Sequence, residues 1–344
     1  MAMGRGKPGV NEYRESLERV RKEIHRVIIG QEEVVDLVLL ALLCEGHVLL
    51  EGVPGIGKTM LVRALAGSLS LSFARIQFTP DLMPADILGT SIVMQNNRGG
   101  FDLQFEEGPV FAHLVLADEI NRASPKTQSA LLEAMQERTV TIRGENHRLP
   151  GPFQVLATQN PLEMEGTYPL PEAQVDRFFF KILVDHPSEE ELVEIIQSTS
   201  GPAVPSCRPV LSREELLALQ KAVREVVVPP NVAGYAARLV LGTQPGEKAT
   251  TAGVRQYVRY GAGPRGAQAL VMAAKAQALS TGRLNAGVED VQAVALPALR
   301  HRIGLNFDGQ SEGVSIDLLL AEVIEKTPVE KGIPVELQEK KTTL

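Results

Sequence analysis

Short hydrophobic runs recur through the first half of the chain, and segments with helical spacing separate them. Each run is apolar nearly throughout, which is typical of a strand buried on both faces of a parallel sheet. A helix is predicted from Ser124-Pro125 to Glu137, because serine is a good N-cap and proline fits a first turn. The pattern therefore predicts an α/β fold with a parallel sheet. The strand-like runs are HVLLEG (47–52), FARIQF (73–78), HLVLA (113–117), FQVLAT (153–158) and FFFKILV (178–184).

Two β-hairpins are predicted between these strands. SIVMQ and FDLQF alternate in polarity around NNRGG (96–100). RTVTIRGENHRLP (138–150) predicts a second hairpin, with Gly144-Glu145-Asn146 at its tip. Ahead of the first strand, residues 11–26 and 31–43 predict two helices around a turn at Gly30.

After about residue 186 the pattern predicts helices and no strand. Ser188-x-x-Glu191 and Ser212-x-x-Glu215 are capping-box signatures. Further helices are predicted over 231–242, 264–281 and 288–303. We expect a disordered N-terminus at 1–10, an α/β domain at 11–186, an α-helical domain at 187–330 and a polar tail at 331–344.

Composition and charge exclude several classes of protein. The chain has 35 basic and 42 acidic residues, a net charge of −7, which gives no overall attraction to nucleic acid. Its two cysteines have no metal-ligand spacing and indicate no oxidising compartment. The N-terminus lacks the apolar core of a signal peptide, and the longest apolar run contains Asp36, ends at Glu45 and is too short to span a bilayer. We expect a soluble, cytoplasmic protein.

The segment after the first strand-like run matches the phosphate-binding pattern G-x-x-x-x-G-K-[ST]. It starts at Gly52, ends at Thr59 and continues into KTMLVRALAGSLS, which has helical spacing. In such a loop, backbone N–H groups surround phosphate oxygens, Lys58 supplies charge to the β and γ phosphates, and the hydroxyl of Thr59 is offered to Mg²⁺. The alternative is a glycine-rich turn with a surface lysine.

An acidic pair ends another strand-like run, in HLVLADEIN. Asp118 suits a carboxylate that holds Mg²⁺ through water, and Glu119 suits a base for an attacking water. A GTPase would carry an N-K-x-D motif, which the sequence lacks, and a small-molecule kinase rarely needs the adjacent glutamate. The pair therefore favours nucleotide hydrolysis, although acidic pairs also occur at strand ends without a catalytic role.

Three further residues are weaker candidates when each is considered alone. Asn160 follows a strand-like run and suits contact with water or γ-phosphate, but asparagine there is also common in turns. Arg177 suits an arginine that reaches a neighbouring subunit's nucleotide, or a surface ion pair. Arg265 stands at a predicted helix N-terminus, where an anion, phosphate or carboxylate, would offset its charge.

Together the ordered segments GVPGIGKT, LADEINR, ATQNP, EAQVDRFFF and GPRGAQAL resemble the MoxR family of AAA+ ATPases over about residues 20–305. The first hairpin resembles the family's helix-2 insert. The resemblance implies a P-loop AAA+ core with a small all-α lid, ATP and Mg²⁺ as cofactors, and a homo-oligomeric ring, usually a hexamer, with nucleotides between subunits. It assigns Asp118-Glu119 to Walker B, Asn160 to sensor 1, Arg177 to the arginine finger and Arg265 to sensor 2, in cis or in trans. It assigns Walker A to Gly52, Val53, Pro54, Gly55, Ile56, Gly57, Lys58, Thr59 and Met60, and places Ile29, Gly30 and Gln31 near the adenine.

The resemblance also implies a task for the ATP. It implies a chaperone that activates a client protein complex, including by insertion of a metal cofactor. Such a chaperone would work with a separate von Willebrand A domain protein. The alternative is a nucleic-acid motor related to MCM and RuvB-type helicases. Its support is local, because the two predicted hairpins contain Arg98, Arg138, Arg143, His147 and Arg148. A nucleotide-gated scaffold that hydrolyses too slowly to matter is a third hypothesis.

Overall fold

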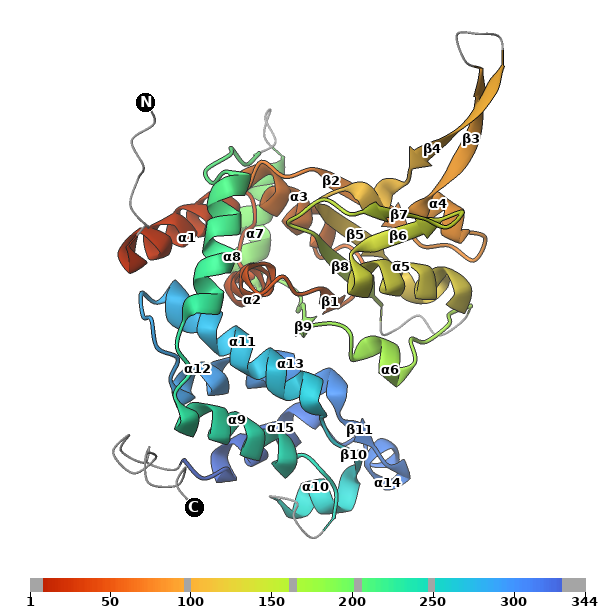
Figure 1. Ribbon diagram of the computed structural model, residues 1–344. Helices are drawn as coiled ribbons and strands as arrows, with labels where there is room; N and C mark the ends of the chain where they lie inside the picture. The colour runs from red at the N-terminus through yellow and green to blue at the C-terminus, as the bar shows by residue number, and fades with distance from the viewer. Residues whose placement is uncertain (1–8, 96–99, 161–165, 201–205, 247–250, 330–344) are drawn as a thin grey trace, which may run out of the picture. The chain divides into compact units, whose positions relative to one another are not determined.

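The computed structural model of the 344-residue chain describes residues 9–95, 100–160, 166–200, 206–246 and 251–329 (Figure 1). The chain divides into two compact units. One comprises residues 15–220, and the other comprises the residues before 15 and those from 221 onward. The division therefore passes through α1 (Val10–His25) and α8 (Arg213–Glu225). The boundary expected at 186/187 coincides instead with the end of the sheet, and α7 (Glu189–Thr199) belongs to the first unit.

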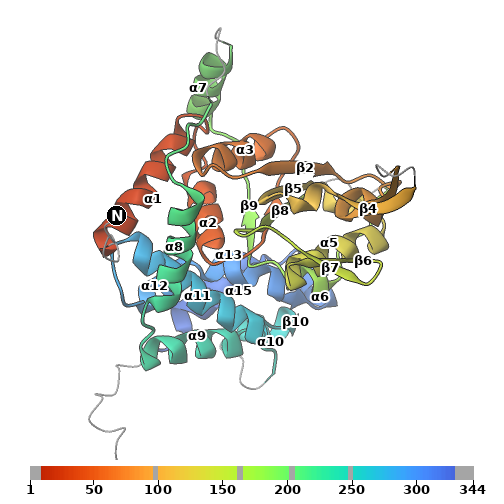
Figure 2. The same ribbon diagram turned by 45° about the horizontal axis from the view of Figure 1, so that its top comes forward.

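A five-stranded parallel sheet forms the centre of the first unit, as predicted. The strand order is β2-β5-β8-β1-β9, so the first strand in sequence lies in the interior and β2 lies at an edge next to β5 (Figure 2). The bounds are β1 Val48–Glu51, β2 Phe73–Gln77, β5 Leu114–Asp118, β8 Gln154–Gln159 and β9 Phe180–Leu183.

Both faces of this sheet are buried, which explains the continuous apolar runs. Leu49, Val115 and Val155 belong to one core cluster, to which α5 (Pro125–Glu137) contributes Leu131 and Met135. The alternate strand residues point to the opposite face. Here α3 (Lys58–Ser68) packs against β2 and β5, and α2 (Glu32–Leu43) packs against β9. The apolar area that these strands bury is the main favourable contribution to the stability of the unit.

Several short elements link the strands of the sheet. The predicted serine cap of α5 is confirmed, because Ser124 accepts a hydrogen bond from the backbone N–H of Thr127. The remaining elements of the first unit are α4 (Pro84–Leu88), α6 (Glu172–Val175), η1 (Pro109–Phe111) and η2 (Ile120–Arg122), none of which the periodicity predicted.

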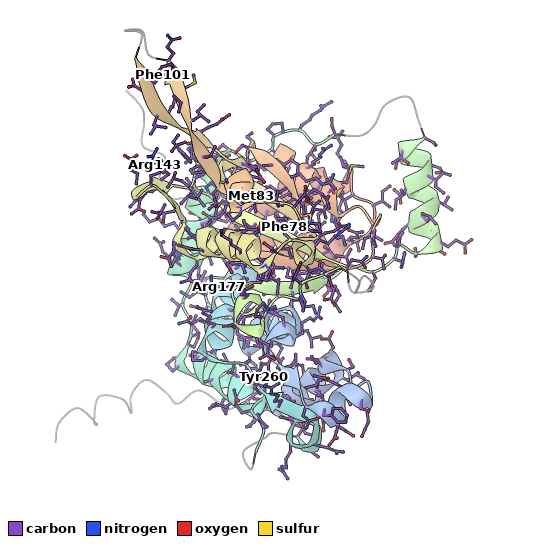
Figure 3. All side chains as sticks on the ribbon, turned by 90° about the vertical axis from the view of Figure 1, so that its right-hand side faces the viewer. Phe78, Met83, Phe101, Arg143, Arg177 and Tyr260 are labelled. Atoms are coloured by element: carbon purple, nitrogen blue, oxygen red, sulfur yellow. The ribbon has the colours of Figure 1, made fainter. Side chains whose placement is uncertain are left out.

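Both predicted hairpins are present, and they contact each other. The first consists of β3 (Gly89–Gln95) and β4 (Phe101–Glu107) and projects from the unit (Figures 1 and 3). The second consists of β6 (Thr139–Ile142) and β7 (Glu145–Arg148). The ring of Phe105 stacks on that of His147, with 4.1 Å between centroids.

The predicted tip of the second hairpin, Gly144-Glu145-Asn146, was wrong. Ile142 pairs with Glu145, so the turn consists of Arg143 and Gly144, and Glu145 and Asn146 belong to β7. Arg143 and Gly144 both have positive φ, 53° and 86°, as a two-residue turn that matches strand twist requires. The expected tip of the first hairpin, at 96–99, lies outside the described residues, as do residues 1–8 and the tail 331–344. Val10, which was expected to be disordered, begins α1.

The second unit is mainly helical, with two departures from prediction. Residues 288–303 do not form one helix, because Pro297 lacks an N–H group and its ring conflicts with the carbonyl four residues earlier. Two short strands, β10 (Val258–Tyr260) and β11 (Gly304–Leu305), pair where no strand was expected. The helices are α9 (Pro230–Gly242), α10 (Ala252–Tyr257), α11 (Pro264–Ser280), α12 (Val288–Ala293), α13 (Ala295–Leu299), η3 (Arg300–Arg302), α14 (Phe307–Ser311) and α15 (Ile316–Lys326).

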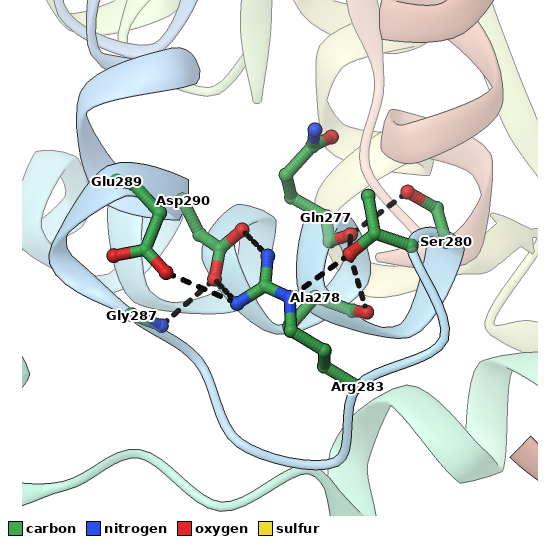
Figure 4. A network of polar contacts seen from close by, with 8 residues as sticks. Gln277, Ala278, Ser280, Arg283, Gly287, Glu289 and Asp290 are labelled. Atoms are coloured by element: carbon green, nitrogen blue, oxygen red, sulfur yellow. Dashed lines mark hydrogen bonds and ion pairs between the residues drawn. The ribbon is translucent and has the colours of Figure 1, made fainter.

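A polar network joins the end of α11 to the start of α12 in this unit (Figure 4). The guanidinium of Arg283 donates to both carboxylate oxygens of Asp290, at 2.5 and 2.9 Å. Asp290 is buried and also accepts from the backbone N–H of Gly287 at 2.7 Å. The network satisfies a buried carboxylate at a helix N-terminus, and Asp290 in turn raises the pKa of Arg283.

Candidate functional site

The glycine-rich loop lies between β1 and α3, and its glycines are needed for different reasons. Gly55 and Gly57 have φ of 85° and 87°, which L side chains rarely adopt, and open space surrounds both. A Cβ at Gly52 would lie 2.6 Å from the carbonyl oxygen of Val184. The loop thus combines left-handed turns, which turn backbone N–H groups toward a shared centre, with a tight contact to the sheet.

A pocket beside this loop gathers candidates from three neighbouring strands. Lys58 and Thr59 begin the helix after β1, Asp118 ends β5, and Asn160 follows β8. The three strands are adjacent and parallel, so their carboxyl ends meet at one edge, where α/β sheets bind ligands. The lining residues are Pro54, Gly55, Gly57, Lys58, Thr59, Met60, Arg63, Arg75, Asp118, Glu119, Thr158 and Asn160.

Lys58 is turned back onto its own loop. Its Nζ donates to the carbonyl oxygen of Gly52 at 2.6 Å. Partial burial lowers the pKa of Lys58, while Asp118, Glu119 and Glu51 act in the opposite direction. The half-buried ammonium therefore faces a net negative environment, and an anionic ligand would offer it a stronger partner than one carbonyl.

Thr158 fixes the two acidic residues relative to each other. Its hydroxyl donates to Asp118 Oδ1 at 2.7 Å and accepts from the backbone N–H of Glu119 at 2.8 Å. Glu119 has a φ of 56°, which is uncommon for a residue with a side chain and is found most often at functional sites.

The edge strand β2 supplies further partners to both carboxylates. Arg75 donates to Asp118 Oδ2 through two nitrogens, at 2.6 and 3.1 Å, and to Gln77 Oε1 at 2.8 Å. Gln77 Nε2 donates to Glu119 Oε2 at 2.9 Å. Arg122 donates to the same Glu119 oxygen at 3.0 Å. A continuous polar chain therefore runs from one carboxylate to the other through β2.

Sequence reasoning missed Arg75, Gln77, Arg122 and Thr158. Arg75 and Gln77 occupy alternate positions of a strand that is otherwise apolar, so a shared face was available as a signal. No signal in the sequence showed that this face lies beside the acidic pair. The two strands β2 and β5 are separated by 36 residues, and only the strand order of the sheet brings them together.

A second pocket adjoins the first along the same loop. Ile29 and Gln31 line it, and Gln31 Nε2 donates to the carbonyl oxygen of Ile56 at 2.9 Å. Gly30 has a φ of 64°, and a Cβ there would meet the carboxylate of Glu191. Pro54, Gly55, Gly57 and Met60 line both pockets, and Ile56 lines this one; Val53 is half-buried in the loop. The other lining residues are Val27, Ile28, His186, Pro187, Leu192, Ile195, Ser198 and Thr199.

The predicted arginine finger, Arg177, does not line either pocket. Arg177 lies in a separate hollow with Glu133 and Glu137, and donates to the carbonyl oxygen of Leu132 at 3.1 Å (Figure 3). Its Nε is buried and has no hydrogen-bond partner in the described part of the chain. Arg265 belongs to the second unit, in the first turn of α11.

The donor set of the first pocket fits a nucleotide with Mg²⁺. A threonine hydroxyl and the Asp118 carboxylate are oxygen ligands of the kind that Mg²⁺ prefers. No group of three or more His, Cys, Asp or Glu side chains in the described residues could hold a metal ion alone. Magnesium at this position would need oxygens from phosphate and water, as is usual at nucleotide sites.

The basic residues of the hairpins are partly engaged in other contacts. Arg138 forms an ion pair with Glu45 and ends α5, so it does not belong to a hairpin strand. His147 stacks on Phe105, and Arg98 lies outside the described residues. Arg143 and Arg148 are exposed on the second hairpin.

Comparisons with known proteins agree with this geometry. A model of the ATPase family associated with various cellular activities (AAA) matches residues 47–180, and a model of the AAA lid domain matches residues 251–323. A crystal structure of a protein from Cytophaga hutchinsonii, described as a candidate ATPase, superposes with a TM-score of 0.87 at 39% identity, covering 94% of this chain and 97% of that one. The fold is that of an AAA+ ATPase with a helical lid.

Curated relatives narrow the family. Chaperone MoxR1 of Mycobacterium tuberculosis is 46% identical over 310 residues, which cover 90% of this chain and 81% of the relative. Protein MoxR of Paracoccus denitrificans is 33% identical over 319 residues, which cover 82% and 87%. The chain belongs to the MoxR family of AAA+ ATPases. None of the helices in the described part of the chain combines the length and the hydrophobicity that a bilayer crossing requires.

Proposed function

We propose that this protein hydrolyses ATP to ADP and phosphate and uses the energy to remodel a partner protein complex. The observation that carries the proposal is the single pocket that gathers Lys58, Thr59, Asp118, Glu119 and Asn160. Phosphoryl transfer to water requires a phosphate-binding loop, a lysine, acidic side chains and an amide, and this pocket brings all of them to one edge of the sheet.

Each residue has a role that its position supports. Lys58 binds the β and γ phosphates, which replace the Gly52 carbonyl as its partner. Glu119 accepts a proton from the attacking water, and Asn160 orients that water or the γ-phosphate. Thr59 would hold Mg²⁺ directly and Asp118 would hold it through water; bound there, Mg²⁺ would neutralise phosphate charge.

The adenine is assigned to the adjoining pocket. Its lining by Ile29, Pro187 and Leu192 offers apolar surface to a flat base, and its continuity along the loop from Pro54 to Met60 suits a ligand whose phosphates lie in the first pocket. Gln31, through Ile56, links this pocket to the phosphate loop.

Arg177 is proposed to act on the nucleotide of a neighbouring subunit. It lies in a hollow whose lining shares no residue with the nucleotide pocket, and its buried Nε lacks a partner in the described chain. A second copy that presents a γ-phosphate there would supply one. This arrangement requires a ring, which we propose is a hexamer, and Arg265 is assigned to a sensor role in cis or in trans.

Remodelling of a protein is favoured over movement along nucleic acid. A relative at 46% identity is named a chaperone, the net charge is −7, and hairpin basic residues are partly engaged. We propose that a separate von Willebrand A domain protein and a client complex are the partners, with metal insertion as one outcome. A pull-down with Glu119→Gln in ATP tests this: a von Willebrand A protein or a metalloenzyme is expected, and salt-resistant nucleic acid without a consistent protein would contradict it.

Steady-state hydrolysis tests the site itself. Glu119→Gln is expected to bind ATP normally and to lower kcat by about 10²- to 10⁴-fold, because it removes a general base. Lys58→Ala is expected to lose nucleotide affinity. Glu325→Gln, an exposed neutralisation on α15, is the matched control and should leave both unchanged. Normal turnover by Glu119→Gln would remove Glu119 from its proposed role.

A further inference from the structure

Arg75 forms hydrogen bonds with the carboxylate of Asp118, which is the group proposed to hold magnesium. Two of its guanidinium nitrogens converge on Asp118 Oδ2, and Thr158 donates to Oδ1, so protein donors engage both oxygens of this carboxylate. The side chain of Asp118 is 13% exposed, whereas that of Arg75 is 45% exposed. The carboxylate is therefore held in place by the strand end, while the arginine can leave it toward solvent.

Magnesium and this arginine cannot both use Asp118 without cost. Waters bound to Mg²⁺ donate hydrogen bonds to the carboxylate that holds them, and the two guanidinium nitrogens already take the lone pairs of Oδ2. Two cations that close to one oxygen also repel each other strongly in a partly buried pocket. Binding of Mg²⁺ through a water on Oδ2 of Asp118 therefore requires Arg75 to release that oxygen.

Gln77 connects Arg75 to the carboxylate of Glu119, so a movement of Arg75 also affects Glu119. Its Oε1 accepts from Arg75 while its Nε2 donates to Glu119, so Arg75 fixes the orientation of this carboxamide. Displacement of Arg75 removes one of the two contacts that hold Gln77 at Glu119. The same movement thus loosens the partner of the proposed general base.

We propose that Arg75 is a positioning residue that acts as a built-in competitor of magnesium: it neutralises and orients Asp118 in the nucleotide-free state, and Mg²⁺ with ATP displaces it. This inference rests on the proposed role of Asp118 as a magnesium-binding carboxylate. It assigns Arg75 a role in tuning how strongly nucleotide binding depends on Mg²⁺, separate from that of the phosphate-binding Lys58.

Nucleotide binding with and without magnesium tests the proposal without reference to turnover. The dissociation constant of a fluorescent ATP analogue is measured in EDTA and in saturating MgCl₂. The value in EDTA divided by the value in MgCl₂ gives the magnesium dependence of nucleotide binding. Arg75→Met is expected to raise this ratio about two- to fivefold, the range for an ion pair with a half-exposed arginine. Arg75→Lys, which keeps the charge but offers a single amine, should fall between.

Arg19→Met is the matched control. Arg19 is an exposed arginine of α1 in the same unit, and it is not among the residues that line the two pockets. Arg19→Met removes the same charge outside the nucleotide site, so its ratio should stay near that of the wild type. An unchanged or lower ratio in Arg75→Met, or an equal rise in Arg19→Met, would overturn the role of Arg75. Failure of the wild-type protein to bind the analogue in either condition would overturn the proposed function as well. Circular dichroism establishes that each variant is folded.

Discussion

At the scale of single residues, His47 shows how a buried polar side chain ties together elements far from the site. It lies at the start of β1, on the opposite end from the nucleotide pocket. Its Nδ1 accepts from the backbone N–H of Val155 at 2.9 Å, and its Nε2 donates to the carbonyl oxygen of Met135 at 3.0 Å. This pairing requires the neutral imidazole, and burial lowers the pKa of His47 to about 4.

The stability of the protein is consequently expected to fall in mild acid. Below about pH 6.5 the unfolded chain takes up a proton at His47, whereas the folded chain does so only near pH 4, so the contribution is complete above 6.5 and is lost as pH falls through that window. Its size is about 3 kcal/mol. Denaturant unfolding between pH 7 and 4 should show that the free energy of unfolding depends less steeply on pH in His47→Gln than in wild type, with half-buried His25→Gln on α1 as the control. Equal slopes in wild type and His47→Gln would contradict this account.

Secondary-structure elements were predictable where local pattern and tertiary environment agree. Most of the parallel strands are largely apolar because both sheet faces are covered, so FQVLAT and FFFKILV were recognisable from sequence. The edge strand β2 differs, because Arg75 and Gln77 are exposed. Pro297 was a signal that the helix predicted over 288–303 would break, but the prediction followed the helical periodicity of the segment instead. Strand order is not encoded locally, so the contacts of Arg75 and Gln77 with the acidic pair could not be predicted. The phosphate loop could be predicted, because the spacing of its residues is itself the signal.

The junction between α11 and α12 gives a prediction at this scale. Among the described residues, Arg283→Met leaves buried Asp290 with the backbone N–H of Gly287 as its one remaining donor. It should therefore lower the free energy of unfolding by about 1–3 kcal/mol, discounted because Arg283 is partly exposed. Chemical denaturation measures the change. Arg255→Met, an exposed arginine in the same unit, should change the value by less than about 0.5 kcal/mol. A loss no greater than that of the control would mean that the network contributes little.

At the scale of the whole molecule, the proposed site is incomplete within one chain. The first pocket supplies the phosphate loop, the acidic pair and Asn160, but Arg177 lies in its own hollow with Glu133 and Glu137. An arginine that stabilises transition-state charge is worth about 10³- to 10⁵-fold in rate, so a single chain should hydrolyse ATP slowly. Turnover per subunit should therefore rise with protein concentration as rings assemble, and a constant value from dilute monomer upward would contradict a shared site.

Complementation between two inactive variants tests this central claim most directly. Arg177→Ala retains Glu119 but lacks the arginine, and Glu119→Gln retains the arginine but lacks the base, so each supplies what the other needs. Each variant alone should be inactive, and an equal mixture should recover up to about a quarter of wild-type turnover, the share of interfaces that pair an intact pocket with an intact arginine. No recovery in mixtures shown by native mass spectrometry to contain both variants in one ring would contradict a nucleotide site shared between subunits.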